Sequence, residues 1–230
     1  SFYVIRLGAP IATAMFFEVS LFAAAALVIA PLGAVVVASH QIALNISSLV
    51  YMVPLSLSMA VTLRVGFALG AGNPANAMLS YKIATIFGMT FAAINGLIMY
   101  LAGAWLAGLY TDDQTVIQLA AALMGLAAIF TLSDTFQAVA MGTLRGYKDT
   151  KAVMFITFLS YWPFGLTLGV ILSRTDWLVA GLGARGMWIG FIAGLSVAAV
   201  LLAWRLRIVS RRYRLAHERQ FAETAAGSSS

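Results

Sequence analysis

Two acidic side chains stand out because they lie inside long apolar runs. Glu18 is the single charged residue between positions 7 and 39, and Asp134 is the single charged residue between positions 114 and 144. A carboxylate at the centre of a bilayer costs at least about 2.5 kcal/mol, so each acid needs a compensating role. Both are therefore candidate functional residues.

The two acids also share a predicted depth. Glu18 follows Arg6 by 12 residues, and Asp134 precedes Arg145 by 11 residues. If both arginines mark the same membrane surface, each acid lies roughly 16 to 18 Å below it, at 1.5 Å per helical residue. An apolar environment and a second carboxylate both disfavour the charged form, so such a pair could hold a proton or bind a cation. The alternative is that each acid only hydrogen-bonds between helices.

Helical spacing places further side chains near Asp134. Thr131 and Gln137 could supply neutral oxygens to a hard cation, so Na⁺ bound by Glu18 and Asp134 is one expectation and H⁺ is the other. The ring face of Phe130 could add a weak cation–π contact, although ordinary packing is the favoured interpretation of this residue. No other cofactor is expected.

The apolar run from 41 to 63 is the most polar of the uncharged runs. Gln41, Asn45 and Tyr51 are candidates for a cavity wall, with interhelical hydrogen bonding as the alternative. Pro54 lies near its middle, where it removes a backbone hydrogen bond and favours a kink. Asn95, Ser160, Tyr161 and Pro163 are weaker cavity candidates.

Composition shows what kind of element carries these residues. The 230 residues are 62% hydrophobic and 10% charged, which is far from the balance of a soluble domain. Runs of about 20 apolar residues are long enough to cross the hydrocarbon layer as helices. The sequence therefore predicts an all-α membrane protein, a bundle of six transmembrane helices in one domain over 1–210. The expected spans are about 7–30, 41–66, 83–110, 114–142, 152–173 and 186–206.

Basic residues predict the orientation of this bundle. Twelve of the fourteen Lys and Arg residues fall on one side of the six spans, and Arg174 and Arg185 fall on the other. The positive-inside rule then places both termini in the cytoplasm. Residues 211–230 are expected to form a basic cytoplasmic tail with a flexible end, so the net charge of +6 indicates a membrane flank rather than a nucleic-acid partner.

Small residues in the last span have an architectural interpretation. Gly186, Gly190 and Gly194 recur every four residues, the pattern that lets two membrane helices approach closely. Enzyme chemistry is not expected, because the chain has no cysteine and only one aspartate at membrane depth, and no Ser-His or zinc constellation. The absence of an initial Met suggests a fragment or processed half.

Four motifs resemble one family of transporters. The chain carries Phe-Phe-Glu-Val at 16–19, His-Gln-Ile-Ala-Leu-Asn at 40–45, Val-Thr-Leu-Arg-Val-Gly at 61–66 and Leu-Arg-Gly-Tyr-Lys-Asp-Thr at 144–150. In this order they resemble the NorM branch of the multidrug and toxic compound extrusion (MATE) transporters, over roughly residues 3 to 210.

The resemblance implies a two-lobe transporter. The family has twelve spans in two six-helix lobes, and this sequence is similar to the second lobe, so an N-terminal lobe is the implied partner. The resemblance implies efflux of organic, often cationic drugs across the bacterial inner membrane, coupled to Na⁺ or H⁺. It also implies that Glu18 and Asp134 occupy the positions of the coupling acids. Relatives often carry Tyr where this sequence has Phe130, which weakens the Na⁺ expectation more than the H⁺ one.

Two other functions stay open at this point. A lipid-precursor flippase of the same superfamily would need a cationic cavity for an anionic headgroup, whereas the acids here favour cationic cargo. A non-transporting membrane scaffold would show no ion response when Glu18 or Asp134 is neutralised.

Overall fold

The computed structural model describes residues 2–174 and 182–227, and this part of the chain is helical without a strand. Helices satisfy every backbone N–H and C=O group inside their own segment, which a chain surrounded by lipid requires. Six segments are long and apolar enough to cross a membrane. The predicted all-α bundle of six membrane helices is thereby confirmed.

Turn chemistry separates the first three spans. Helix α1 (Phe2–Ile29) runs into a short 3₁₀ turn, η1 (Ala30–Leu32), and α2 (Ala34–Gly70) is followed by α3 (Pro74–Gly108). Gly33 turns the chain with a φ of 108°, a conformation that suits a residue without a Cβ. The side chain of Asn73 caps α3 by accepting a 3.0 Å hydrogen bond from the backbone N–H of Asn76.

The fifth span is not one regular helix. After α4 (Gln114–Gly146), the chain forms α5 (Thr150–Leu159), a π-helical turn η2 (Ser160–Leu166) and α6 (Thr167–Arg174). Pro163 lies inside η2. A proline has no backbone N–H and clashes with the preceding turn, so a locally wider turn accommodates it. Pro163 lies in the predicted fifth span, but the π-helical turn around it was not predicted from the sequence. By contrast, α2 is continuous through Pro54.

Most of the helices are longer than the predicted spans. Helix α2 begins at Ala34 rather than near 41, α3 begins at Pro74 rather than near 83, and α7 (Ala184–Gly227) continues through most of the predicted basic tail at 211–230. The segment 211–226 contains no proline or glycine and is rich in Arg and Ala, which both favour helix. The last three residues lie outside the described part.

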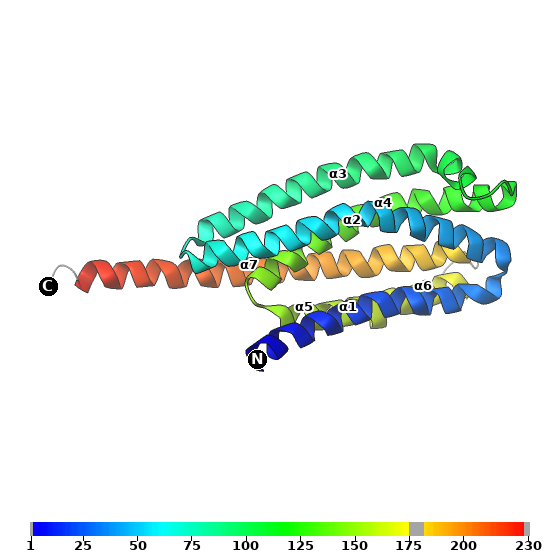
Figure 1. Cartoon of the computed structure of the whole chain (residues 1–230). Helices are drawn as coiled ribbons and strands as arrows, with labels where there is room; N and C mark the ends of the chain where they lie inside the picture. The colour runs from blue at the N-terminus through cyan, green and yellow to red at the C-terminus, as the bar shows by residue number, and fades with distance from the viewer. Residues whose placement is uncertain (1, 175–181, 228–230) are drawn as a thin grey trace.

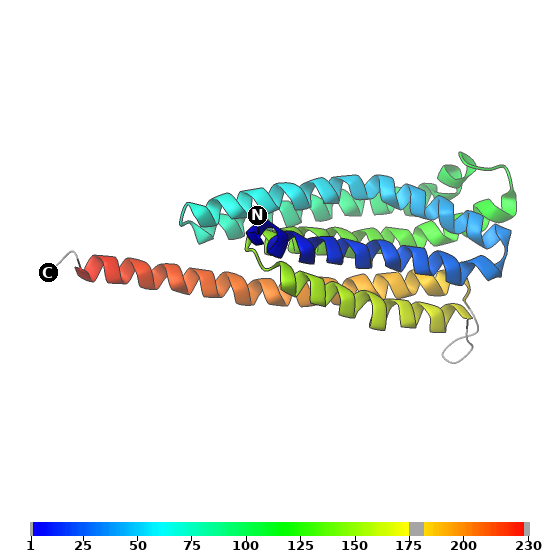
Figure 2. The ribbon, with the colours of Figure 1, turned by 60° about the horizontal axis from the view of Figure 1, so that its bottom comes forward.

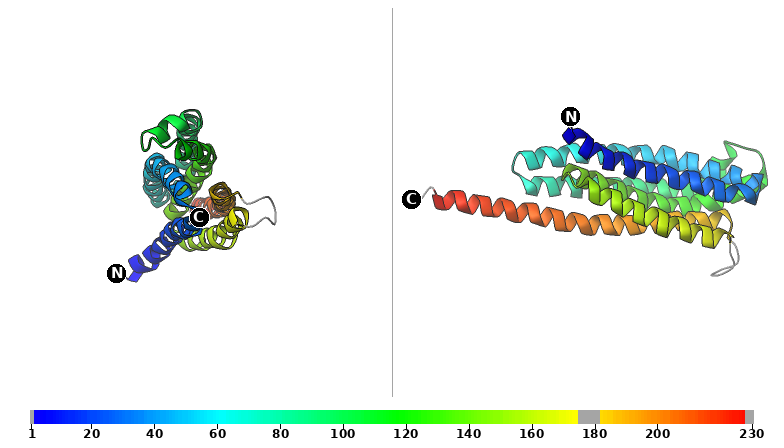
Figure 3. Two further views of the ribbon diagram at one scale, coloured as in Figure 1. Left: turned by 90° about the vertical axis from the view of Figure 1, so that its right-hand side faces the viewer. Right: turned by 90° about the horizontal axis from the view of Figure 1, so that it is seen from below.

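Figure 1 shows an elongated bundle whose N-terminus lies at the same end as the α2–α3 and α4–α5 connections, with α7 projecting beyond that end. Figure 2 shows the same order after a turn about the long direction. Helix α4 packs against α2, α3 and α7, whereas α1 packs mainly on α5 and η2. The end-on view in Figure 3 shows the resulting groups, α2 with α3 and α4 on one side and α1 with α5 and α6 on the other. Helix α7 contacts both groups.

Buried apolar side chains form two cores along this bundle. The core at the end that carries the α1–α2 and α3–α4 turns includes Leu21, Phe130 and Trp188. The core at the end of the N-terminus includes Ala14 and Val139. Glu18 and Asp134 thus occupy the level between the two cores, on α1 and α4 respectively. The same level holds a 2.9 Å hydrogen bond between the hydroxyls of Ser133 and Ser196, which links α4 to α7.

Glycine allows α7 to lie directly on the fifth span. A Cβ added at Gly190 would lie 2.5 Å from the Cα of Gly169, and one at Gly194 would lie 3.0 Å from the Cα of Gly165. A Cβ at Gly186 would lie 2.5 Å from the backbone of Leu172. The three glycines that the sequence pattern singled out therefore face the backbone of the neighbouring helix, where dispersion contacts hold membrane helices together.

Replacing Gly190 by Ala should lower stability, because the new methyl group meets backbone atoms that cannot move aside. Overpacking of this kind costs about 1–3 kcal/mol. Gly66→Ala is the matched control, since no atom lies within 4 Å of a Cβ at that position in α2. Thermal unfolding in detergent, followed by circular dichroism, should show a lower midpoint for Gly190→Ala and an unchanged or slightly higher one for Gly66→Ala. Equal midpoints for the two variants would contradict this packing role.

Candidate functional site

Glu18 and Asp134 line the same cavity, which has a volume of about 240 Å³. The cavity lies between α1, α2 and α4. Its polar wall on α2 consists of Ser47, Ser48 and Tyr51, and the remaining lining is Val19, Phe22, Leu44 and Phe130. The two acids that shared a predicted depth are thus neighbours in space.

Neutral hydroxyl groups surround the carboxyl groups in this cavity. The Tyr51 hydroxyl forms a side-chain hydrogen bond with Glu18. Asp134 is 8% exposed and Ser47 is buried, whereas Glu18 is half-buried. Glu18 and Asp134 are close enough to interact electrostatically. Two negative charges in one small apolar cavity repel each other. A proton or cation between them would remove this repulsion.

Arg145 is a functional candidate that was not predicted from the sequence, where it served only as a marker of the membrane surface. It lies in the last turn of α4, where its guanidinium donates a 3.1 Å hydrogen bond to the Met141 sulfur and interacts electrostatically with Glu18. Its Nε atom is buried without a hydrogen-bond partner. Arg145 lies three turns of helix beyond Asp134. That spacing was the signal available in the sequence, but it did not reveal that the side chain acts on Glu18.

A buried hydrogen bond joins α4 to the π-helical turn beside this cavity. The Gln137 amide donates to the Tyr161 hydroxyl, and both side chains are at most 1% exposed. The amide oxygen of Gln137 is buried without a partner. Gln137 therefore contacts Tyr161 and is not in the cavity lining, and their hydrogen bond links α4 to the irregular turn η2.

The remaining predicted cavity residues have different places. Phe130 and Tyr51 line the cavity with the acids. Thr131 is buried and donates its hydroxyl to the backbone oxygen of Ala127 at 2.8 Å. Gln41 and Asn45 are exposed on α2 and are not in the lining. Asn45 follows the lining residue Leu44 by one position, which turns it about 100° away around the helix.

Aromatic rings close one side of the cavity. The Phe22 ring lies 6.2 Å from that of Phe130 and 5.0 Å from that of Phe191. The Trp188 ring lies 5.5 Å from that of Phe130, and its indole N–H donates a 3.2 Å hydrogen bond to Nδ1 of His40. These rings exclude water from the end of the cavity next to Phe130 and strengthen the electrostatic interactions inside it.

The cavity lies at the seam between the two helix groups. Glu18 comes from α1, which packs mainly on α5 and η2, and Asp134 comes from α4, which packs mainly on α2 and α3. Within residues 2–174 and 182–227, no group of three or more His, Cys, Asp or Glu side chains could hold a metal ion. The cavity itself offers a cation two carboxylates and neutral hydroxyl oxygens as possible ligands.

Comparison with known proteins places this architecture. Residues 10–171 match the family model described as MatE. The chain is 71% identical, over 97% of its length, to a "Probable multidrug resistance protein NorM" of Idiomarina loihiensis, and 48% identical, over 88% of its length, to a "Multidrug resistance protein NorM" of Photobacterium profundum. It covers 48% and 44% of those two relatives, respectively. The chain thus spans about half the length of the curated relatives it matches.

A solved structure has the same fold. The eukaryotic MATE transporter AtDTX14 superposes with a TM-score of 0.81 at 25% identity, covering 94% of this chain and 48% of that one. The extent of the family-model match, the identity to NorM proteins and this superposition agree. The chain belongs to the MatE family of membrane transporters.

Proposed function

We propose that this chain is the ion-coupling half of a multidrug efflux antiporter, with Glu18 and Asp134 as the site for Na⁺ or H⁺. The observation that supports this most strongly is the single small cavity that both acids line between two apolar cores. Packing alone does not need two carboxylates at one membrane level, since each charge is costly there. Reversible binding of Na⁺ or H⁺ to the two carboxylates would explain why they are kept at this level.

The volume of the cavity suits an inorganic ion better than a drug-sized molecule. Pockets for drug-sized molecules usually occupy about 300–1,000 Å³, and the cavity here measures about 240 Å³. We therefore assign it to an inorganic cation or a proton, and we assign the organic substrate to a larger space completed by the other half of the transporter. In repeat transporters such a space lies between the two halves, which move against each other.

The seam provides a mechanism for coupling. With both acids charged, repulsion between α1 and α4 opposes closure of the seam, and the attraction of Arg145 for Glu18 draws the acid away from Asp134. Proton or cation binding removes the repulsion and favours a closed seam. Binding energy is thus converted into a shift of α1 and the irregular fifth span relative to α2, α3 and α4. Tyr161 and Gln137 would carry this shift across the contact between η2 and α4.

The charge of the site favours cationic cargo. The acids face a cavity whose other polar groups are neutral hydroxyls, whereas a flippase for an anionic headgroup would need a cationic cavity. The relatives with high identity are called multidrug resistance proteins, which supports organic drugs as substrates. The bundle would lie in the inner membrane of a bacterium. The end that carries the N-terminus and the projecting part of α7 would then face the cytoplasm.

Neutralising either acid should weaken ion binding. In Glu18→Gln and Asp134→Asn, calorimetric titration of the purified chain with NaCl should show at least about tenfold lower affinity, because each variant removes one charged ligand from a poorly solvated site. If H⁺ is the coupling ion, Na⁺ binding is absent in every variant. The readout is then the infrared band of protonated carboxyl groups across pH, which should shrink in both variants.

Asp113→Asn is the matched control, because Asp113 is an exposed acid that caps α4 at the far end of the bundle. It should leave the Na⁺ affinity unchanged. Na⁺ binding and carboxyl protonation that persist at the wild-type level in both cavity variants would overturn the coupling assignment and favour a scaffold.

Transport should require the other half. Vesicles that contain the 230-residue chain alone should show no efflux of a cationic dye. A chimera in which this chain replaces the corresponding half of the Idiomarina loihiensis relative should transport it, given the 71% identity. Introducing Asp134→Asn into the chimera should abolish efflux. Dye efflux by the isolated chain, or full efflux by the substituted chimera, would contradict the proposal.

A further inference from the structure

A basic groove lies at the end of the bundle where α7 leaves it. The groove has a volume of about 930 Å³ and is formed by the α2–α3 connection, the first turns of α3 and the projecting part of α7. Its charged lining consists of Lys82, Arg211, Arg214, His217 and Glu218. Neither the coupling site nor the predicted spans involve this groove.

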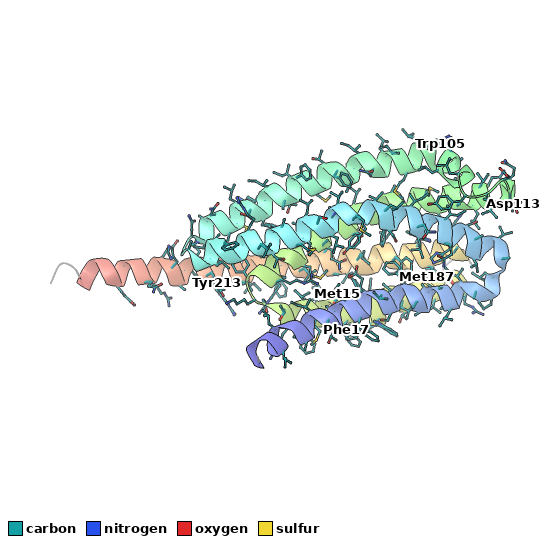
Figure 4. All side chains as sticks on the ribbon, in the orientation of Figure 1. Met15, Phe17, Trp105, Asp113, Met187 and Tyr213 are labelled. Atoms are coloured by element: carbon teal, nitrogen blue, oxygen red, sulfur yellow. The ribbon has the colours of Figure 1, made fainter. Side chains whose placement is uncertain are left out.

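The projecting part of α7 is held on the bundle and is not a loose tail. Arg205 forms a 2.6 Å ion pair with Asp149, and the Tyr213 ring lies 5.2 Å from that of Tyr147. Figure 4 labels Tyr213, which lies where α7 emerges from the other helices. Farther along, His217 lies against the α2–α3 turn, since a Cβ at Gly72 would be 3.6 Å from its ring. These contacts fix the cationic side chains of α7 beside α3.

Cations exceed anions in the groove. Lys82 and Arg211 are exposed and pair with no carboxylate in the described part of the chain, whereas Arg214 pairs with Glu218 at 3.7 Å. Helix α3 begins at Pro74 beside them, so the positive end of its dipole adds to the field. The groove therefore favours an anion.

An apolar groove with a few polar lining residues continues from the basic one. It has a volume of about 260 Å³, lies between α2 and α3, and shares Leu79 with the basic groove. Its polar lining residues are Arg64, Asn76 and Ser80. Leu79, Ile83 and Phe87 follow each other at four-residue intervals on one face of α3 and are 52%, 59% and 58% exposed. A ligand with an anionic head and a long apolar chain matches both grooves at once.

The depth of the grooves agrees with such a ligand. Helix α3 has 35 residues, a length of about 52 Å, which exceeds the roughly 30 Å of hydrocarbon by about 11 Å at each end if the helix is centred. Lys82 lies near the boundary that results, with Ile83 and Phe87 beyond it on the hydrocarbon side. The basic groove then lies at headgroup depth and the apolar groove at the depth of the acyl chains.

We propose that these joined grooves form a binding site for an anionic phospholipid, with the phosphate at Lys82 and Arg211 and an acyl chain along Leu79, Ile83 and Phe87. Juxtamembrane basic residues attract anionic lipids at the membrane surface. The bound lipid would tie the projection of α7 to α3 and stabilise this end of the bundle.

Lipid binding to the purified chain in neutral detergent tests the proposal, with native mass spectrometry as the readout. Phosphatidylglycerol should bind more tightly than phosphatidylcholine, and Lys82→Gln/Arg211→Gln should weaken phosphatidylglycerol binding about tenfold or more. The matched control is Arg174→Gln/Arg185→Gln, which removes two exposed arginines at the opposite end of the bundle and should change nothing.

Further arms identify the source of the phosphate and guard against misfolding. Glycerol phosphate, which lacks acyl chains, should not compete at concentrations where phosphatidylglycerol saturates. Glu218→Gln should tighten binding, a gain that a misfolded variant would not produce. Equal losses in both arginine-containing double variants, no preference for phosphatidylglycerol, or full competition by glycerol phosphate would each overturn the lipid assignment.

Discussion

The electrostatic cost of two carboxyl groups between apolar cores is the constraint on which the rest of the structure depends. Glu18 and Asp134 lie at one level of the bundle, with Leu21 and Phe130 in the core on one side and Ala14 and Val139 in the core on the other. Water cannot solvate charge inside such packing. The surrounding helices therefore supply hydroxyl groups from α2, the Tyr51 hydrogen bond and the distant positive charge of Arg145. A protein that needed only to pack would use apolar residues at this level.

The packing of the helices divides the two acids between two helix groups. The acids come from different helix groups, and α7 is the element that contacts both. Gly190 and Gly194 allow α7 to touch the backbone of the fifth span, so that group is closely packed. The Thr62 hydroxyl donates a 2.7 Å hydrogen bond to the backbone oxygen of Gly142, which ties α2 to α4 in the other group. Two tightly packed groups with a polar seam between them can shift as units when the charge at the seam changes.

Much of this organisation could be predicted from the sequence. Long apolar runs predicted the six spans, because only helices satisfy the backbone hydrogen bonds in lipid. The shared depth of Glu18 and Asp134 in the membrane followed from residue spacing alone. Spacing could not decide rotation about the helix axis, so Gln41 and Asn45 were expected at the cavity but are exposed.

Other features depend on contacts between distant residues. The effect of Arg145 on Glu18, the pairing of Gln137 with Tyr161 and the grooves beside α3 join segments that lie far apart in the chain. The π-helical turn at Pro163 is a local adjustment whose form depends on how the neighbouring helix packs. The helical tail was predictable in principle, since helix-forming residues follow the last span without a break, but its basic residues predicted only a cytoplasmic flank with a flexible end.

The central claim is that Glu18 and Asp134 act as one site. The most direct measurement is a double-mutant cycle of proton exchange. Protons taken up or released by the purified chain during titration with NaCl are counted by calorimetry in buffers of different ionisation enthalpy. If the acids share one site, the chain with both Glu18→Gln and Asp134→Asn should lose no more proton exchange than either single variant does. Losses that simply add would show two independent carboxyl groups and contradict a shared coupling site.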